Sequence, residues 1–96
     1  MMVLITYDVD TTTYTGQKRL NKVAKTCVNF GQRVQKSVFE CILEPQQYVE
    51  IKAKLAKIID EEKDSIRLYN LGSNWKSRVE HLGAKEPYDP EGILIT

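Results

Sequence analysis

The chain has 96 residues, of which 42% are hydrophobic and 28% charged, and its formal net charge is +1 at pH 7. This composition is ordinary for a single soluble globular domain. No apolar stretch approaches the roughly 20 residues that cross a bilayer, and no positive region precedes the N-terminal apolar run, so we expect a cytoplasmic protein without a membrane span.

The first half of the chain predicts a strand, a helix and a second strand. Residues 2–9 form a nearly continuous apolar run that suits the middle of a sheet. Residues 16–30 have apolar side chains at helical spacing, and Gly31 is a plausible cap for the helix end. Residues 33–43 are rich in strand formers, although their alternation slips at Val38 and Phe39, as a bulge or burial on both sides would produce.

The second half predicts another helix and further strands. A helix begins at Pro45 and ends within residues 60–63. Residues 65–71 read as a third strand, and residues 78–82 are a shorter candidate for a fourth. A polar connection after Gly83 leads to a short terminal strand over residues 93–95.

These elements favour an α+β fold of the ferredoxin-like βαββαβ type with a short additional C-terminal strand. We expect one domain over residues 1–96, in which residues 84–96 are a C-terminal tail. A chain this short buries a modest fraction of its surface, and apolar side chains fall on both faces of the first two strands. We therefore expect the open sheet face to pack against a second copy in a two-fold homodimer, and the terminal strand to add to a neighbour's sheet edge.

Cys27 and Cys41 are far apart in the sequence and lie among apolar neighbours. They form no C-x-x-C pair, so reduced thiols in the core are favoured over a disulfide or a zinc site.

The basic residues are concentrated in one part of the chain. Residues 11–39 contain no acid and six cations, which we predict to bind nucleic acid: Lys18, Arg19, Lys22, Lys25, Arg33 and Lys36. Lys18 and Lys22 form a like-charge i, i+4 pair that costs a few tenths of a kcal/mol in an isolated helix, which favours an anionic partner such as a phosphate backbone. The alternative is a solvated helix face with no partner.

Asp8 follows the first apolar run and is our candidate metal ligand. At the end of a central strand its side chain can project beyond the sheet, and Mg²⁺ binds through one or two carboxylates while keeping several waters. A two-fold dimer that brings two copies of Asp8 together would supply the pair. The alternative is that Asp8 and Asp10 only favour the turn that follows, because Asp side chains bond to local backbone N–H groups.

Residues 33–39 offer further groups for a nucleic acid. Arg33 and Lys36 can meet phosphates, Ser37 can donate a hydrogen bond, and Phe39 can stack on a base. The alternative for Phe39 is a place in the core, because it lies in a hydrophobic strand.

Five segments of the chain form a familiar combination, namely YDVD, KRLNKVAK, GQRVQKSVFE, RVEHLGAK and YDPEGILIT. Together they resemble the CRISPR-associated protein 2 family, whose members are small ferredoxin-like subunits encoded beside the CRISPR spacer integrase. The resemblance covers nearly the whole chain, and the tail is most similar to subtype I-C members.

The resemblance implies a function and its residues. The family's metal-binding aspartate corresponds to Asp8, contributed once by each protomer, and its arginine and Ser-x-Phe element correspond to Arg33, Ser37 and Phe39, which we take as catalytic with Asp8. Members are Mg²⁺-dependent endonucleases that cut single-stranded RNA or double-stranded DNA, and they join the integrase in spacer acquisition.

Two other functions remain open at this point. The chain could be a non-catalytic structural adaptor that clamps duplex DNA in the integrase complex, with Asp8 as a turn residue. It could also be a toxin-like ribonuclease on the same fold, because fold alone does not determine function.

Overall fold

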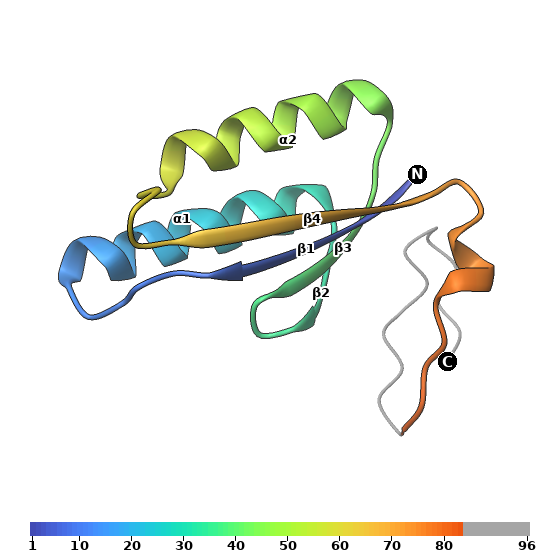
Figure 1. The fold of residues 1–96 in the computed structure, drawn as a ribbon, viewed down its shortest axis with the longest axis horizontal. Helices are drawn as coiled ribbons and strands as arrows, with labels where there is room; N and C mark the ends of the chain where they lie inside the picture. Colours follow the sequence, from blue (N-terminus) through green and yellow to red (C-terminus); the bar gives the residue numbers. More distant parts are fainter. Residues whose placement is uncertain (84–96) are drawn as a thin grey trace.

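The computed structural model describes residues 1–83, which form one sheet covered by two helices (Figure 1). The elements in chain order are β1 (Met2–Asp8), α1 (Tyr14–Phe30), β2 (Gln32–Gln35), β3 (Val38–Ile42), α2 (Pro45–Ile58), β4 (Ser65–Gly72) and a short 3-10 helix, η1 (Trp75–Arg78).

The sheet has the strand order β2-β3-β1-β4, and every neighbouring pair is antiparallel. The first helix connects β1 to β2 with β3 between them, and the second connects β3 to β4 with β1 between them. This split arrangement is the ferredoxin-like fold, and the predicted fold class is confirmed.

Two of the predicted strands are wrong in detail. Residues 33–43 are not one strand but the hairpin of β2 and β3, and the slip in alternation at Val38 and Phe39 marks the exit from a turn at Lys36 and Ser37. Residues 78–82 are not a strand, because η1 ends at Arg78 and no regular structure follows it up to residue 83. The predicted strand over residues 93–95 and the tail over 84–96 lie outside the described residues.

The helix bounds also differ slightly from prediction. The first helix begins at Tyr14, two residues before the predicted start. Thr13 is its N-cap, and the Thr13 Oγ1 accepts a hydrogen bond from the Gly16 N–H. The second ends at Ile58, before the predicted stop, because Ile59 is already extended.

One hydrophobic core lies between the helices and the sheet. The strand β1 contributes Val3, Ile5 and Tyr7 to it, while α1 contributes Val23 and Cys27, and further buried residues come from β3 and α2. Because side chains alternate along a strand, the residues between them in β1 point to the other face of the sheet, which no described helix covers.

Both cysteines are free and buried in this core, as predicted. Burial raises the pKa of the Cys27 thiol to about 11 and that of Cys41 to about 12. Within residues 1–83, neither helix has the length and apolar character to cross a bilayer.

Gly31 allows the end of α1 to approach β3 closely. Its backbone is extended, so its value is not a left-handed conformation but the missing side chain. A Cβ at this position would overlap the Cys41 sulfur and the Glu40 carbonyl oxygen.

We expect Gly31→Ala to lower the free energy of unfolding by about 1–3 kcal/mol. The overlapping atoms include backbone atoms of β3, so this strand must shift to relieve the overlap. The measurement is the urea midpoint and slope. Asn29→Ala is the control, since Asn29 is exposed near the same helix end and its loss should change stability by less than about 0.5 kcal/mol. Equal midpoints for the two variants would contradict the close packing.

Candidate functional site

Asp8 is the last residue of β1 and is exposed. Its neighbour Tyr7 points into the core, so Asp8 points to the sheet face away from the helices. Its cross-strand partner in β4 is Ser65. Within residues 1–83 the Asp8 carboxylate makes no hydrogen bond or ion pair, which leaves both of its oxygens available to a ligand.

Asp10 has a different role, and here the turn alternative is correct. Its Oδ1 accepts a hydrogen bond of 2.9 Å from the Thr12 N–H and one of 2.7 Å from the Thr12 hydroxyl. These bonds lower the pKa of Asp10. The carboxylate is therefore used in the turn between β1 and α1, and Asp8 is the carboxylate at this strand end that has no such bond.

The β2–β3 turn lies beside the end of β1. The Tyr7 N–H donates to the Ser37 carbonyl oxygen at 3.1 Å, and the Tyr7 hydroxyl donates to the Lys36 carbonyl oxygen at 3.3 Å. The structure thus brings Lys36 and Ser37 close to the residue that precedes Asp8.

Arg33 and Phe39 lie on the opposite face from Asp8. They are cross-strand partners in β2 and β3, and the Arg33 guanidinium carbon is 5.1 Å from the centre of the Phe39 ring. Phe39 is 0% exposed and belongs to the core, so no base can stack on it in this structure and the core alternative is correct. Burial raises the pKa of Tyr7, and the nearby Arg33 charge partly offsets that rise.

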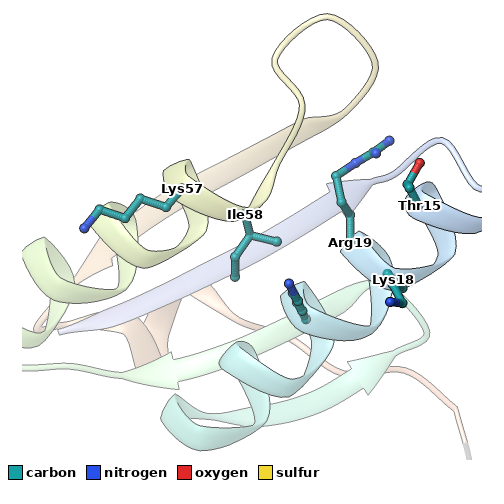
Figure 2. A pocket seen from close by; sticks show the side chains of 6 residues that line it. Thr15, Lys18, Arg19, Lys57 and Ile58 are labelled. Carbon is teal, nitrogen blue, oxygen red and sulfur yellow. The ribbon is translucent and has the colours of Figure 1, made fainter.

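The basic surface is on the helix layer. Lys18, Lys22 and Lys25 are exposed along α1. A hollow of about 300 Å³ opens between the two helices, lined by Thr15, Lys18, Arg19, Lys22, Lys57 and Ile58 (Figure 2). The labelled lysines point in different directions instead of converging on one point, an arrangement better suited to several phosphates than to one ion.

Lys57 is the cation that the sequence analysis missed. It lies in the last turn of α2 and therefore outside the acid-free segment that drew attention to α1. Only the packing of α2 beside α1 brings it to the same hollow, so no local pattern could have found it.

Arg19, one of the predicted nucleic-acid-binding cations, lines the same hollow but is paired with a carboxylate of its own chain. Its Nε donates to Asp64 Oδ2 at 2.7 Å and its Nη2 donates to Asp64 Oδ1 at 3.4 Å. The side chains of Arg19 and Asp64 are 16% and 0% exposed, so the pair is internal to the protein. In Figure 2, Arg19 leaves α1 in a different direction from Lys18. The Arg19 charge is therefore compensated by Asp64 and is part of the scaffold.

Asp64 accepts two more hydrogen bonds from the backbone. The Asp10 N–H donates to its Oδ1 at 3.0 Å, and the Asp60 N–H donates to its Oδ2 at 2.9 Å. Burial alone would raise the pKa of Asp64, but the Arg19 guanidinium and these N–H groups outweigh it and hold the pKa below its usual value.

The α1 lysines of the predicted phosphate-binding set therefore lie on the face opposite Asp8, whereas Lys36 lies in the turn beside the end of β1. Asp8 is on the open sheet face, while the lysines of α1 and α2 are on the helix layer. Residues 1–83 contain no group of three or more His, Cys, Asp or Glu side chains that could hold a metal ion. Asp8 fits Mg²⁺ as a single hard oxygen ligand, and a second carboxylate would come from elsewhere than this described segment.

Comparison with known proteins gives a consistent result. The family model described as CRISPR associated protein Cas2 matches residues 1–79. The chain is 59% identical over 95 residues to the CRISPR-associated endoribonuclease Cas2 of Chlorobaculum tepidum, which covers 99% of both chains. It is also 59% identical over 95 residues to the CRISPR-associated endonuclease Cas2 of Halalkalibacterium halodurans, again over 99% of both.

Solved structures agree with these sequence matches. The crystal structure of Streptococcus pyogenes Cas2 at pH 6.5 is similar with a TM-score of 0.75 and 63% identity, over 86% of this chain and 100% of that one. A hypothetical protein from Thermus thermophilus matches with a TM-score of 0.70 and 28% identity, over 86% of this chain and 90% of that one.

The lowered pKa of Asp64 predicts an acid-dependent loss of stability. A carboxyl group whose pKa is depressed by folding stabilises the protein above its unfolded value of about 3.9, and this contribution disappears as the pH falls through the folded value. We expect Asp64→Asn to cost roughly 1–3 kcal/mol at pH 7, because buried donors lose a charged acceptor.

The measurement is the urea stability of both proteins from pH 7 down to pH 3. The difference between them should shrink below about pH 4, where the Asp64 carboxyl group becomes protonated in the unfolded wild-type chain, and should disappear as the pH falls through the lower pKa of the folded state. A difference that stays constant over this range would contradict an ionised Asp64.

Proposed function

Because the chain belongs to the Cas2 family of CRISPR-associated proteins, we propose that it is a Mg²⁺-dependent endonuclease subunit that cuts phosphodiester bonds of single-stranded RNA or duplex DNA. Relatives of nearly the same length carry the names endoribonuclease and endonuclease, which supports this proposal. We further propose that it works with the CRISPR integrase in spacer acquisition, which rests on the family alone.

Asp8 is the observation that carries the proposed activity. An exposed carboxylate with no partner in residues 1–83 is a ready ligand for a hard cation, whereas Asp10 and Asp64 spend their oxygens on internal hydrogen bonds. Bound at Asp8, Mg²⁺ would lower the pKa of a water molecule and stabilise charge on a phosphoryl oxygen. Lys36 and Ser37, in the turn beside β1, would position the phosphodiester.

The second carboxylate would come from a second copy of the chain in a two-fold homodimer. The sheet face that carries Asp8 also presents the half-buried side chains of Leu4, Val38 and Ile42, which alternate with core residues and have no helix over them in residues 1–83. Burying such a face in a symmetric contact would remove apolar area from water, and each of the two chains would contribute one Asp8.

The adaptor function is the alternative that the geometry favours specifically. The lysines of α1 and α2 are on the face opposite Asp8, so a duplex held there would not be presented to the Asp8 of the same chain. A protein that only clamps DNA in the integrase complex would need these lysines and not Asp8.

We expect Asp8→Ala to lower cleavage by at least about 100-fold, since even the outer-shell partners of metal ligands are worth 10–100-fold. The assay follows labelled single-stranded RNA and duplex DNA with Mg²⁺ or with chelator, while duplex binding is measured separately. Glu61→Gln is the control, because it removes an exposed acid from the loop before β4. If the wild type cuts neither substrate, or Asp8→Ala cuts as well as the wild type, the nuclease proposal is wrong and the adaptor replaces it.

We expect Lys22→Gln and Lys57→Gln each to weaken duplex binding and to reduce the slope of log K against log salt by about 1, because each lysine neutralises about one phosphate. Lys52→Gln is the matched control, since Lys52 lies on α2 but does not line the hollow. An unchanged slope for both variants would mean that the duplex binds elsewhere. Cleavage of a short oligonucleotide should be retained, because these residues are remote from Asp8.

A further inference from the structure

Asp64, the partner of Arg19, is linked to the end of β1 in two ways. The Asp64 carboxylate accepts a hydrogen bond from the N–H of Asp10, two residues after Asp8. The next residue after Asp64 is Ser65, which is the cross-strand partner of Asp8 itself. Asp8 and Asp64 are therefore connected twice, once along the chain to Asp10 and its hydrogen bond, and once through Ser65 and the β1–β4 pairing.

The Asp64 carboxylate that makes these connections is fully buried. The Asp64 side chain is 0% exposed and takes two hydrogen bonds from Arg19 and one each from the Asp10 and Asp60 backbones. Four N–H donors match the lone-pair capacity of a carboxylate, so rotation of the Asp64 carboxylate would break hydrogen bonds. An ionised carboxylate away from water is tolerated only with such partners, which makes the arrangement specific.

The packing on the other side of Asp10 has the same effect. Gly16 is buried in the first turn of α1, and a Cβ there would overlap the Asp10 carbonyl oxygen. The Asp10 backbone is thus held at its N–H by the hydrogen bond to Asp64 and at its carbonyl group by close packing against α1. On the strand side, the Tyr7 N–H is bonded to Ser37, so the backbone is fixed both before and after Asp8.

We propose that Asp64 and Arg19 are positioning residues that hold the Asp8 carboxylate in the place where it binds a divalent cation. They touch neither the cation nor the nucleic acid, and act through the Asp10 backbone that follows Asp8 and through Ser65, the cross-strand partner of Asp8. The inference rests on the proposed function of Asp8 as a metal ligand. Its physical basis is that a ligand held by its surroundings binds a metal without first losing conformational freedom.

The test uses Arg19→Gln in the full-length protein and has two readouts. Amide hydrogen exchange reports the backbone at Tyr7 and Asp10, on either side of Asp8, and at Gly31, whose N–H is bonded to Cys27 at the other end of α1. Mn²⁺ binding, followed by the electron paramagnetic resonance of the free ion, reports the metal affinity without nucleic acid. Glu61→Gln is the matched control and Asp8→Ala defines the loss of the site.

We expect Arg19→Gln to raise exchange at Asp10 at least tenfold, while Tyr7, whose N–H is bonded to Ser37, and Gly31 stay protected, and to weaken Mn²⁺ binding by about 10–100-fold. Glu61→Gln should behave as the wild type in both. Where Arg19→Gln does not fold, Arg19→Lys keeps the charge but loses the two-point contact, and should give smaller changes of the same kind.

The remaining outcomes separate the two proposals. Unchanged exchange at Asp10, an equal rise at Gly31, or wild-type Mn²⁺ affinity in the Arg19 variant would overturn the positioning role and leave Asp8 as a ligand. Equal Mn²⁺ binding by the wild type and Asp8→Ala would overturn the metal site itself.

Discussion

The buried carboxylate of Asp64 is the constraint on which one end of this molecule depends. A charge without water needs donors, and here they come from the loop after β1, from α1 and from the loop after α2. Segments 45 residues or more apart in sequence are joined at one group. The alternative of a solvated loop at this end would leave the direction of the β1 terminus, and therefore of Asp8, to fluctuation.

The fold separates two kinds of surface that are mixed in the sequence. Strand alternation sends Asp8 to the open sheet face, while the helical period sends the lysines of α1 away from the sheet. A nucleic acid that meets both surfaces must pass around the sheet edge or be shared between copies of the chain. Arg33 shows the same division, since it belongs to the helix side with Phe39 although the family pattern groups it with Asp8.

Much of the fold could be predicted from the sequence, because each main element has a clear period and the predicted family is confirmed. The hairpin was missed because the turn at Lys36 and Ser37 lacks the Gly, Asn or Pro that usually marks one. The pairing of Arg19 with Asp64 was missed for a different reason, since counting cations along α1 cannot reveal a partner 45 residues away. For the candidate site, the turn role of Asp10 is local and was one of two alternatives that the sequence left open, whereas the roles of Asp8 and Ser37, the subtype and the dimer stay predictions.

The two cysteines should be unreactive toward thiol reagents in the folded protein. With pKa values of about 11 and 12 and no access to solvent, only about one thiol in ten thousand or fewer would be a thiolate at neutral pH. Alkylating reagents and fluorescent maleimides should therefore ignore the native protein, whose sequence holds no other cysteine. A single cysteine introduced at the exposed Ser65, across the sheet from Asp8, would then carry a label at a known distance of one strand from the candidate ligand.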